Sequence, residues 1–182
     1  MMASIEIPWE RYGTIAYIAE AVGSLGKTAL QKLVYFLQEW RRVPLGYSFD
    51  LYTYGPFSAD LMGDLDYTAF LGAVNVQYII NGGYSISSAE KNQEVRDRAS
   101  AFLTTYEADF AEVVRLFGKC AAWQLELRAT IHLACQQMLS TMEPLSDEGI
   151  VDVIHSLKPG KFTDQQIKQA VDELREHHVI AN

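Results

Sequence analysis

The chain has 182 residues, 49% hydrophobic and 21% charged, which is the composition of a globular protein and excludes a disordered or fibrous one. Its 15 basic and 23 acidic side chains give a formal net charge of −8, which disfavours nucleic acids and anionic membranes and favours basic partners or partners recognised by shape. Two cysteines, Cys120 and Cys135, provide neither a disulfide framework nor a four-ligand zinc site, and the N-terminus shows no export signal, so we expect a cytoplasmic protein.

Helical periodicity and then strand periodicity mark the first part of the chain. Apolar residues at helical spacing predict helices from Pro8 to Val22 and from Thr28 to Arg42. The period then changes to two, which predicts a half-buried strand over residues 47–54 that stops at Gly55–Pro56.

A third helix and a hairpin follow. Ser58 is a good N-cap, and inward-facing Leu61, Leu65, Phe70 and Leu71 predict a helix that ends at Gly72. Two alternating segments, Val76–Ile80 and Tyr84–Ser88, flank Asn81–Gly82 and predict a β-hairpin with a two-residue type I′ turn.

The chain from Glu90 onward has the pattern of helices. Long apolar stripes over residues 95–117 and 123–138 precede two shorter helices, 147–157 and 164–178, which the Lys158–Pro159–Gly160 turn separates. Thr163 and Gln166 form a capping box at the start of the last helix.

These elements predict a mainly α fold (α+β), with a winged-helix-like N-terminal half that carries a β-hairpin wing and a helical C-terminal half. We expect a module at residues 1–89 and a helical region at 90–182, sharing one core. Gly55–Pro56–Phe57–Ser58 and Gly160–Lys161–Phe162–Thr163 each open a capped helix. Either the two caps are simply alike, or residues 90–182 contain a second helix-turn-helix-like unit.

The segments LQKLVYFLQ (residues 30–38) and YGPFSADLMGDLDY (54–67) resemble the Panacea-type antitoxin domains and, more closely, the related YwgA-like family of uncharacterised bacterial proteins. Residues 125–131 and 157–163 also resemble this family, so the resemblance spans residues 27–180. It implies a non-enzymatic module that binds a protein, in some members as the neutralising half of a toxin–antitoxin pair. The expected partner is then a toxin or another basic protein.

The candidate partner-binding residues combine an aromatic turn with the carboxylates of the third helix. The aromatic turn consists of Tyr52, Tyr54, Gly55, Pro56 and Phe57. It forms a recognition surface, covers the strand–helix junction, or does both. The candidate residues are Tyr52, Tyr54, Gly55, Pro56, Phe57, Asp60, Asp64 and Asp66.

The alternative function is that of a winged-helix transcription regulator that binds DNA. The third helix argues against DNA readout, since it carries three aspartates and no basic residue. Lys158, Lys161, Lys168 and Arg175 could serve the second unit, although Asp164, Asp172, Glu173 and Glu176 offset their charge.

We expect no enzymatic activity, no cofactor and no metal site. The chain has no nucleophile elbow, phosphate-binding loop, dinucleotide fingerprint or zinc-protease motif. His132 and Cys135 lie three residues apart on a helix, where they are either metal ligands or core residues, and the absence of further ligands nearby favours the core. A small enzyme with a site assembled from scattered residues is the third hypothesis.

Overall fold

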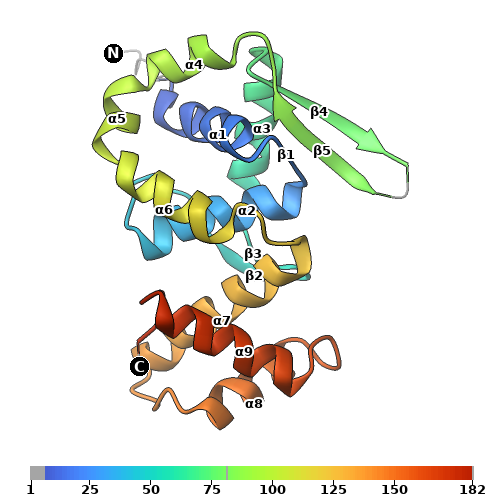
Figure 1. The fold of residues 1–182 in the computed structure, drawn as a ribbon, viewed down its shortest axis with the longest axis vertical. Helices are drawn as coiled ribbons and strands as arrows, with labels where there is room; N and C mark the ends of the chain where they lie inside the picture. The colour runs from blue at the N-terminus through green and yellow to red at the C-terminus, as the bar shows by residue number, and fades with distance from the viewer. Residues whose placement is uncertain (1–6, 81, 182) are drawn as a thin grey trace, which may run out of the picture. The chain divides into compact units, whose positions relative to one another are not determined.

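The computed structural model describes residues 7–80 and 82–181. The fold is mainly helical, with 61% helix, 11% strand and a small antiparallel sheet (Figure 1). The chain divides into two compact units: unit 1 contains Met1–Ser48 and Ser58–Lys119, and unit 2 contains Phe49–Phe57 and Cys120–Asn182. This division differs from the predicted boundary at residue 89, because residues 90–117 pack on the first two helices while residues 49–57 belong to unit 2.

Unit 1 consists of helices around a buried apolar core and a three-stranded sheet. Its core includes Ile15, Leu33 and Leu65, which are each at most 1% exposed. The helices are α1 (Trp9–Val22), α2 (Lys27–Tyr35), the π-helical turn η1 (Phe36–Trp40), α3 (Ala59–Phe70), α4 (Asn92–Arg98), α5 (Ser100–Thr105) and α6 (Glu107–Phe117).

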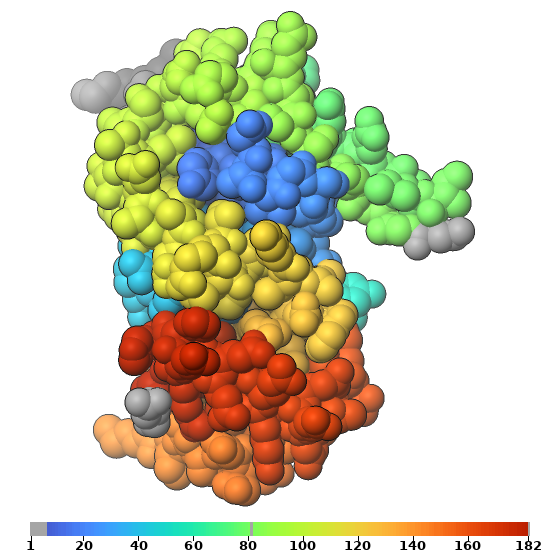
Figure 2. Space-filling view, viewed as in Figure 1, coloured from blue at the N-terminus to red at the C-terminus, as the bar shows by residue number. Residues whose placement is uncertain are grey.

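The sheet of unit 1 has the antiparallel order β1-β5-β4, formed by β1 (Ser24–Leu25), β4 (Val74–Ile79) and β5 (Gly83–Ser88). The β4–β5 hairpin extends beyond the helices of unit 1, as Figure 2 shows. The predicted hairpin is present, but the prediction of a two-residue type I′ turn at Asn81–Gly82 is wrong. Three residues, 80–82, connect the paired strands. Ile79 pairs with Gly83, which has the positive φ of 80°, and the Gly82 N–H donates to the Ile79 carbonyl at 2.9 Å. Asn81 lies outside the described residues.

Unit 2 contains a short hairpin and three helices. The hairpin pairs β2 (Asp50–Tyr52) with β3 (Gly55–Phe57), and the helices are α7 (Ala122–Ser140), α8 (Asp147–Leu157) and α9 (Asp164–Glu176). Strand β3 packs on α7, and the three helices share a core that includes Ile131, Ile154 and Ile167. The predicted capping box of α9 is confirmed, since Thr163 and Gln166 bond each other's backbone.

Three further predictions about local structure are wrong. The half-buried strand over residues 47–54 is reduced to exposed β2, because Gly55–Pro56–Phe57 is itself a strand and the chain turns before it. Phe70 is 81% exposed, because the buried face of α3 follows Leu61, Leu65 and Thr68, and Phe70 lies about 200° around the helix from Thr68. The apolar stripe over residues 95–117 forms three short helices instead of one.

Across residues 7–80 and 82–181, no helix combines the length and the apolar character needed to cross a membrane.

Candidate functional site

The β2–β3 hairpin of unit 2 carries two exposed aromatic side chains at its tip. Tyr52 is 66% exposed and Tyr54 is 57% exposed, and the ring of Tyr52 lies 5.6 Å from that of Phe57. Tyr52 pairs with Gly55, so Thr53 and Tyr54 form the turn, and Gly55 adopts a φ of 83° that favours glycine. Gly55 and Pro56 are buried. The aromatic turn therefore has a buried base and an exposed tip.

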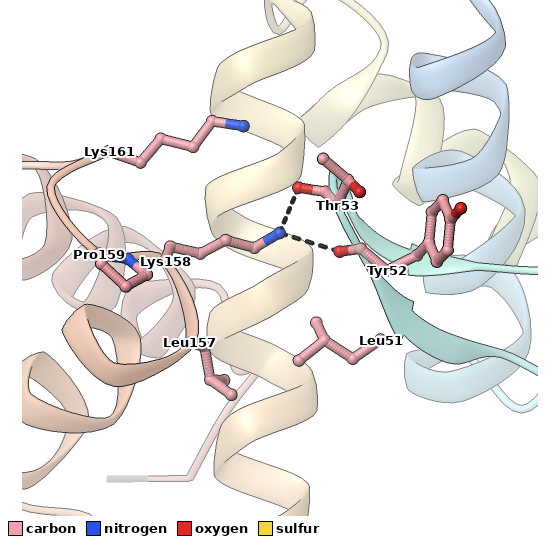
Figure 3. Close-up of a pocket in the computed structure, with 7 residues that line it drawn as sticks. All are labelled: Leu51, Tyr52, Thr53, Leu157, Lys158, Pro159 and Lys161. Carbon is pink, nitrogen blue, oxygen red and sulfur yellow. Dashed lines mark hydrogen bonds between the residues drawn. The ribbon is translucent and has the colours of Figure 1, made fainter.

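A buried lysine, Lys158, forms hydrogen bonds with the backbone of this tip. The Lys158 ammonium donates to the carbonyl oxygens of Tyr52 at 3.0 Å and of Thr53 at 2.5 Å (Figure 3). Its side chain is 6% exposed and lies 3.4 Å from the Glu126 carboxylate of α7. Burial lowers the pKa of Lys158, and the negative charge of Glu126 opposes that shift. The three acceptors match the three protons of a charged ammonium.

Glu126 joins this lysine to a second one. Its side chain is 4% exposed, and the Lys161 ammonium lies 2.7 and 2.8 Å from its two oxygens. Lys161 also lies over the ring of Tyr54, 4.8 Å from its centroid. One buried carboxylate therefore fixes two lysines of the loop between α8 and α9, and these lysines contact the hairpin tip through its carbonyls and its aromatic ring.

A pocket of about 550 Å³ lies between the hairpin and this loop. In Figure 3, Leu51 of the hairpin and Leu157 of α8 lie on opposite sides of the pocket, and the Tyr52 ring is directed away from the Lys158 ammonium. The pocket combines apolar side chains with backbone carbonyls and ammonium groups. The lining residues are Leu51, Tyr52, Thr53, Leu157, Lys158, Pro159 and Lys161. In the described part of the chain, no cluster of three or more His, Cys, Asp or Glu side chains could hold a metal ion.

The three carboxylates of α3, in unit 1, do not form one exposed face. Asp64 is 16% exposed, accepts a hydrogen bond from the Tyr47 hydroxyl at 2.9 Å and lies 3.5 Å from the Arg11 guanidinium. Burial, together with the Asp64 charge, raises the pKa of Tyr47. Asp60 and Asp66 are exposed. The predicted acidic surface of three aspartates is thus reduced to two, because the Asp64 carboxylate is bonded to Tyr47 and paired with Arg11 inside unit 1.

A buried glutamine links the two segments that carry the family resemblance. The Gln31 amide donates to the Ser58 carbonyl at 2.8 Å and accepts from the Ser58 N–H at 2.9 Å. About two helical turns further along, Gln38 forms the same pair of hydrogen bonds with Tyr47. Its side-chain amide accepts from the Tyr47 N–H at 2.8 Å and donates to the Tyr47 carbonyl at 2.7 Å. Sequence reasoning missed both contacts, although a polar residue inside the apolar stripe of a helix is the signal that could have indicated them.

The remaining candidate residues are held in intramolecular contacts. His132 and Cys135 are each 1% exposed within α7, and burial raises the pKa of the Cys135 thiol to about 11. Arg175 bonds Asp147 and the Leu145 carbonyl. Of the four basic side chains predicted to serve a second DNA-binding unit, Lys158, Lys161 and Arg175 are therefore paired with carboxylates of unit 2. Lys168 is exposed.

A scan of the chain against protein-family models gives no match, and a search of curated proteins gives none either.

Proposed function

We propose that this protein is a non-enzymatic regulatory module that binds another protein, in the manner of an antitoxin. The observation that carries the proposal is the combination of exposure and anchorage at the β2–β3 tip. Tyr52 and Tyr54 are exposed, while Lys158 fixes the backbone that carries them. Aromatic side chains dominate the energetics of protein interfaces, and a tip that is already ordered loses little entropy on binding.

Charge supports a basic partner. The net charge of −8 attracts a basic protein from a distance, and exposed Asp50, Asp60 and Asp66 add local acidity. The pocket beneath the tip offers apolar contacts from Leu51 and Leu157 to a side chain of that partner. Tyr52 and Tyr54 would then supply most of the binding energy, and the carboxylates would supply the rate and specificity of association.

The alternative, a winged-helix regulator of transcription, has one observation in its favour. In unit 1, α1, β1, α2, α3 and the β4–β5 hairpin follow one another in the order of a winged helix, with β1 paired to β5. Its chemistry is unfavourable, since α3 has no basic residue and residues 67–89, which include the hairpin, have no charged residue. We therefore prefer the protein-binding function.

Co-purification from native cells tests the proposal. The tagged wild-type chain should enrich one protein, and the double variant Tyr52→Ser/Tyr54→Ser should bind that protein at least roughly thirtyfold more weakly by titration calorimetry. Trp123→Ser is the matched control, because Trp123 is an exposed aromatic residue of the same unit, at 45%. This variant should keep wild-type affinity.

Two outcomes would contradict the proposal. One is equal affinity of the double variant and the wild type for the enriched protein. The other is recovery of DNA instead of protein, with retention on duplex DNA that falls steeply as salt is added, which is the behaviour expected of the alternative.

A further inference from the structure

Helix α3 of unit 1 has an exposed face that carries both carboxylates and aromatic rings. Its buried side follows Leu61, Leu65 and Thr68. Because each residue turns the helix by 100°, the opposite side lies within about 120° of arc around Gly63 and Phe70. We call this side the α3 outer face, and its residues Asp60, Gly63, Asp66, Tyr67 and Phe70 are all exposed.

The C-terminal half of the α3 outer face is aromatic. Phe70 is 81% exposed and Tyr67 is 44% exposed, and their ring centroids lie 5.9 Å apart. The Tyr67 ring also lies 5.2 Å from the ring of Tyr12 in α1, which is only 7% exposed. Packing on this buried ring orders Tyr67 before any partner arrives. Ordered, exposed aromatic side chains are the residues that contribute most to protein interfaces.

The N-terminal half of the same face is acidic and is not neutralised by the chain around it. Residues 43–90 contain no lysine, arginine or histidine. Asp60 and Asp66 form no ion pair with the described residues, whereas Asp64, at the edge of the buried side, is paired with Arg11. The two exposed carboxylates are therefore open to a cation from another molecule.

We propose that the α3 outer face binds a basic amphipathic helix of a partner protein. Gly63 lies in the middle of the face, and even a Cβ built there would meet nothing within 4 Å, so the backbone of a second helix can approach closely. Gly63, Tyr67 and Phe70 follow the i, i+4, i+7 spacing with which one helix packs on another. Apolar side chains of the bound helix would contact the two rings, and its lysines or arginines would pair with Asp60 and Asp66.

Charge selects this partner over the other candidates. The net charge of −8 repels a nucleic acid and a second copy of this chain, and it attracts a cationic helix. The aromatic pair adds apolar area that a merely basic segment would not use. The inference goes beyond the proposed function, because it gives unit 1 a binding surface of its own, whereas the β2–β3 tip belongs to unit 2.

Titration calorimetry of the full chain with a synthetic helical peptide tests the inference. The probe has about 18 residues, long enough to be helical, with leucines at i, i+3, i+4 and i+7 spacing and lysines elsewhere. At about 0.15 M salt it should bind wild type, while the same peptide with glutamate for lysine should not. Asp60→Asn/Asp66→Asn should weaken binding roughly fivefold, and Phe70→Ser roughly tenfold.

Two control variants locate the peptide. Asp152→Asn/Asp172→Asn removes the same charge from exposed positions of unit 2 and should keep wild-type affinity. Tyr52→Ser/Tyr54→Ser should keep it too, and this separates the inference from the proposed function. Circular dichroism checks that all variants stay folded.

The inference would be overturned by failure of the lysine peptide to bind or by equal binding of the glutamate peptide. It would also be overturned if either control variant lost as much affinity as Asp60→Asn/Asp66→Asn, since binding would then depend on total charge or on the β2–β3 tip.

Discussion

Buried side-chain amides set the path of the chain in unit 1. Gln31 is 2% exposed and replaces, for Ser58, the hydrogen bonds that a strand neighbour would supply. Ser58 is also the N-cap of α3, so the amide fixes the point at which that helix begins. A buried glutamine is tolerated here because the groups it bonds are themselves buried backbone groups in need of partners.

Replacing this glutamine should destabilise the protein. Gln31→Leu keeps much of the side-chain volume but leaves the Ser58 N–H and C=O buried without a partner, and we expect a loss of about 2–4 kcal/mol of unfolding free energy. Gln38 forms the same pair of hydrogen bonds with Tyr47 at a half-buried position, where water can replace the amide. Gln38→Leu should therefore lower the unfolding free energy by about 1 kcal/mol. Urea unfolding monitored by circular dichroism measures both, and equal losses would contradict this interpretation.

The ion pair between α7 and α9 makes unit 2 sensitive to acid. Burial opposes ionisation of Glu173, but the hydrogen bond and charge of Arg128 outweigh it, so the pKa of Glu173 falls below its ordinary value. A carboxyl group with a lowered pKa in the folded state stabilises the fold above its unfolded pKa of 4.5 and loses that contribution as pH falls further.

Glu173→Gln should therefore lower the melting temperature at pH 7 and reduce the difference in stability between pH 7 and pH 3. The expected loss at pH 7 is about 1 kcal/mol or less, because the Glu173 side chain is 36% exposed. Glu176→Gln, at an exposed position of the same helix, is the control. An unchanged pH profile in Glu173→Gln would exclude this role for the pair.

At the level of elements, a close approach between helices depends on one glycine. A Cβ built on Gly13 of α1 would lie 2.3 Å from the Cβ of Ala99, at the junction of α4 and α5. Gly63 of α3 also lies inside a helix, but a Cβ there meets nothing within 4 Å. The two glycines have the same intrinsic cost to a helix and opposite packing environments.

Alanine substitutions at these two positions should have effects of opposite sign. Gly13→Ala forces α1 away from Ala99 and should destabilise the protein by about 1–2 kcal/mol. Gly63→Ala should stabilise it by about 0.5–1 kcal/mol through helix propensity alone. Thermal unfolding measures both shifts. Stabilisation by Gly13→Ala would show that α1 and the α4–α5 junction can separate at little cost.

Helices with local signals were predictable from sequence, and strands without them were not. The caps at Ser58 and Thr163 fixed the starts of α3 and α9, because capping depends on residues within one turn. The alternation in residues 47–54 led to a wrong prediction of a half-buried strand, since β2 is exposed on both faces. The position of β2 depends on Lys158, which lies 106 residues along the chain from Tyr52. Similarly, α2 passes into a π-helical turn at Phe36 with no proline or glycine to mark it.

For the molecule as a whole, the aromatic part of the candidate site was predictable and its support was not. Tyr52 and Tyr54 stand out in the sequence because they lie close together, directly before Gly55–Pro56. The sequence analysis considered Lys158 and Lys161 only as contacts to DNA and did not single out Glu126, since nothing local relates a carboxylate in one helix to lysines in a later loop. The one available signal was Glu126 itself, a charged residue on the buried face of an apolar helix.

The division of the chain into units has a consequence for any attempt to take the protein apart. The backbone enters unit 2 for residues 49–57, returns to unit 1 and enters unit 2 again at Cys120. A gene fragment that begins at codon 120 encodes Lys158 without the two carbonyls that accept its hydrogen bonds, and a fragment that ends at codon 119 encodes those carbonyls without the lysine. Isolating either unit therefore requires splicing two stretches of coding sequence through a designed linker, because no single truncation yields a complete one.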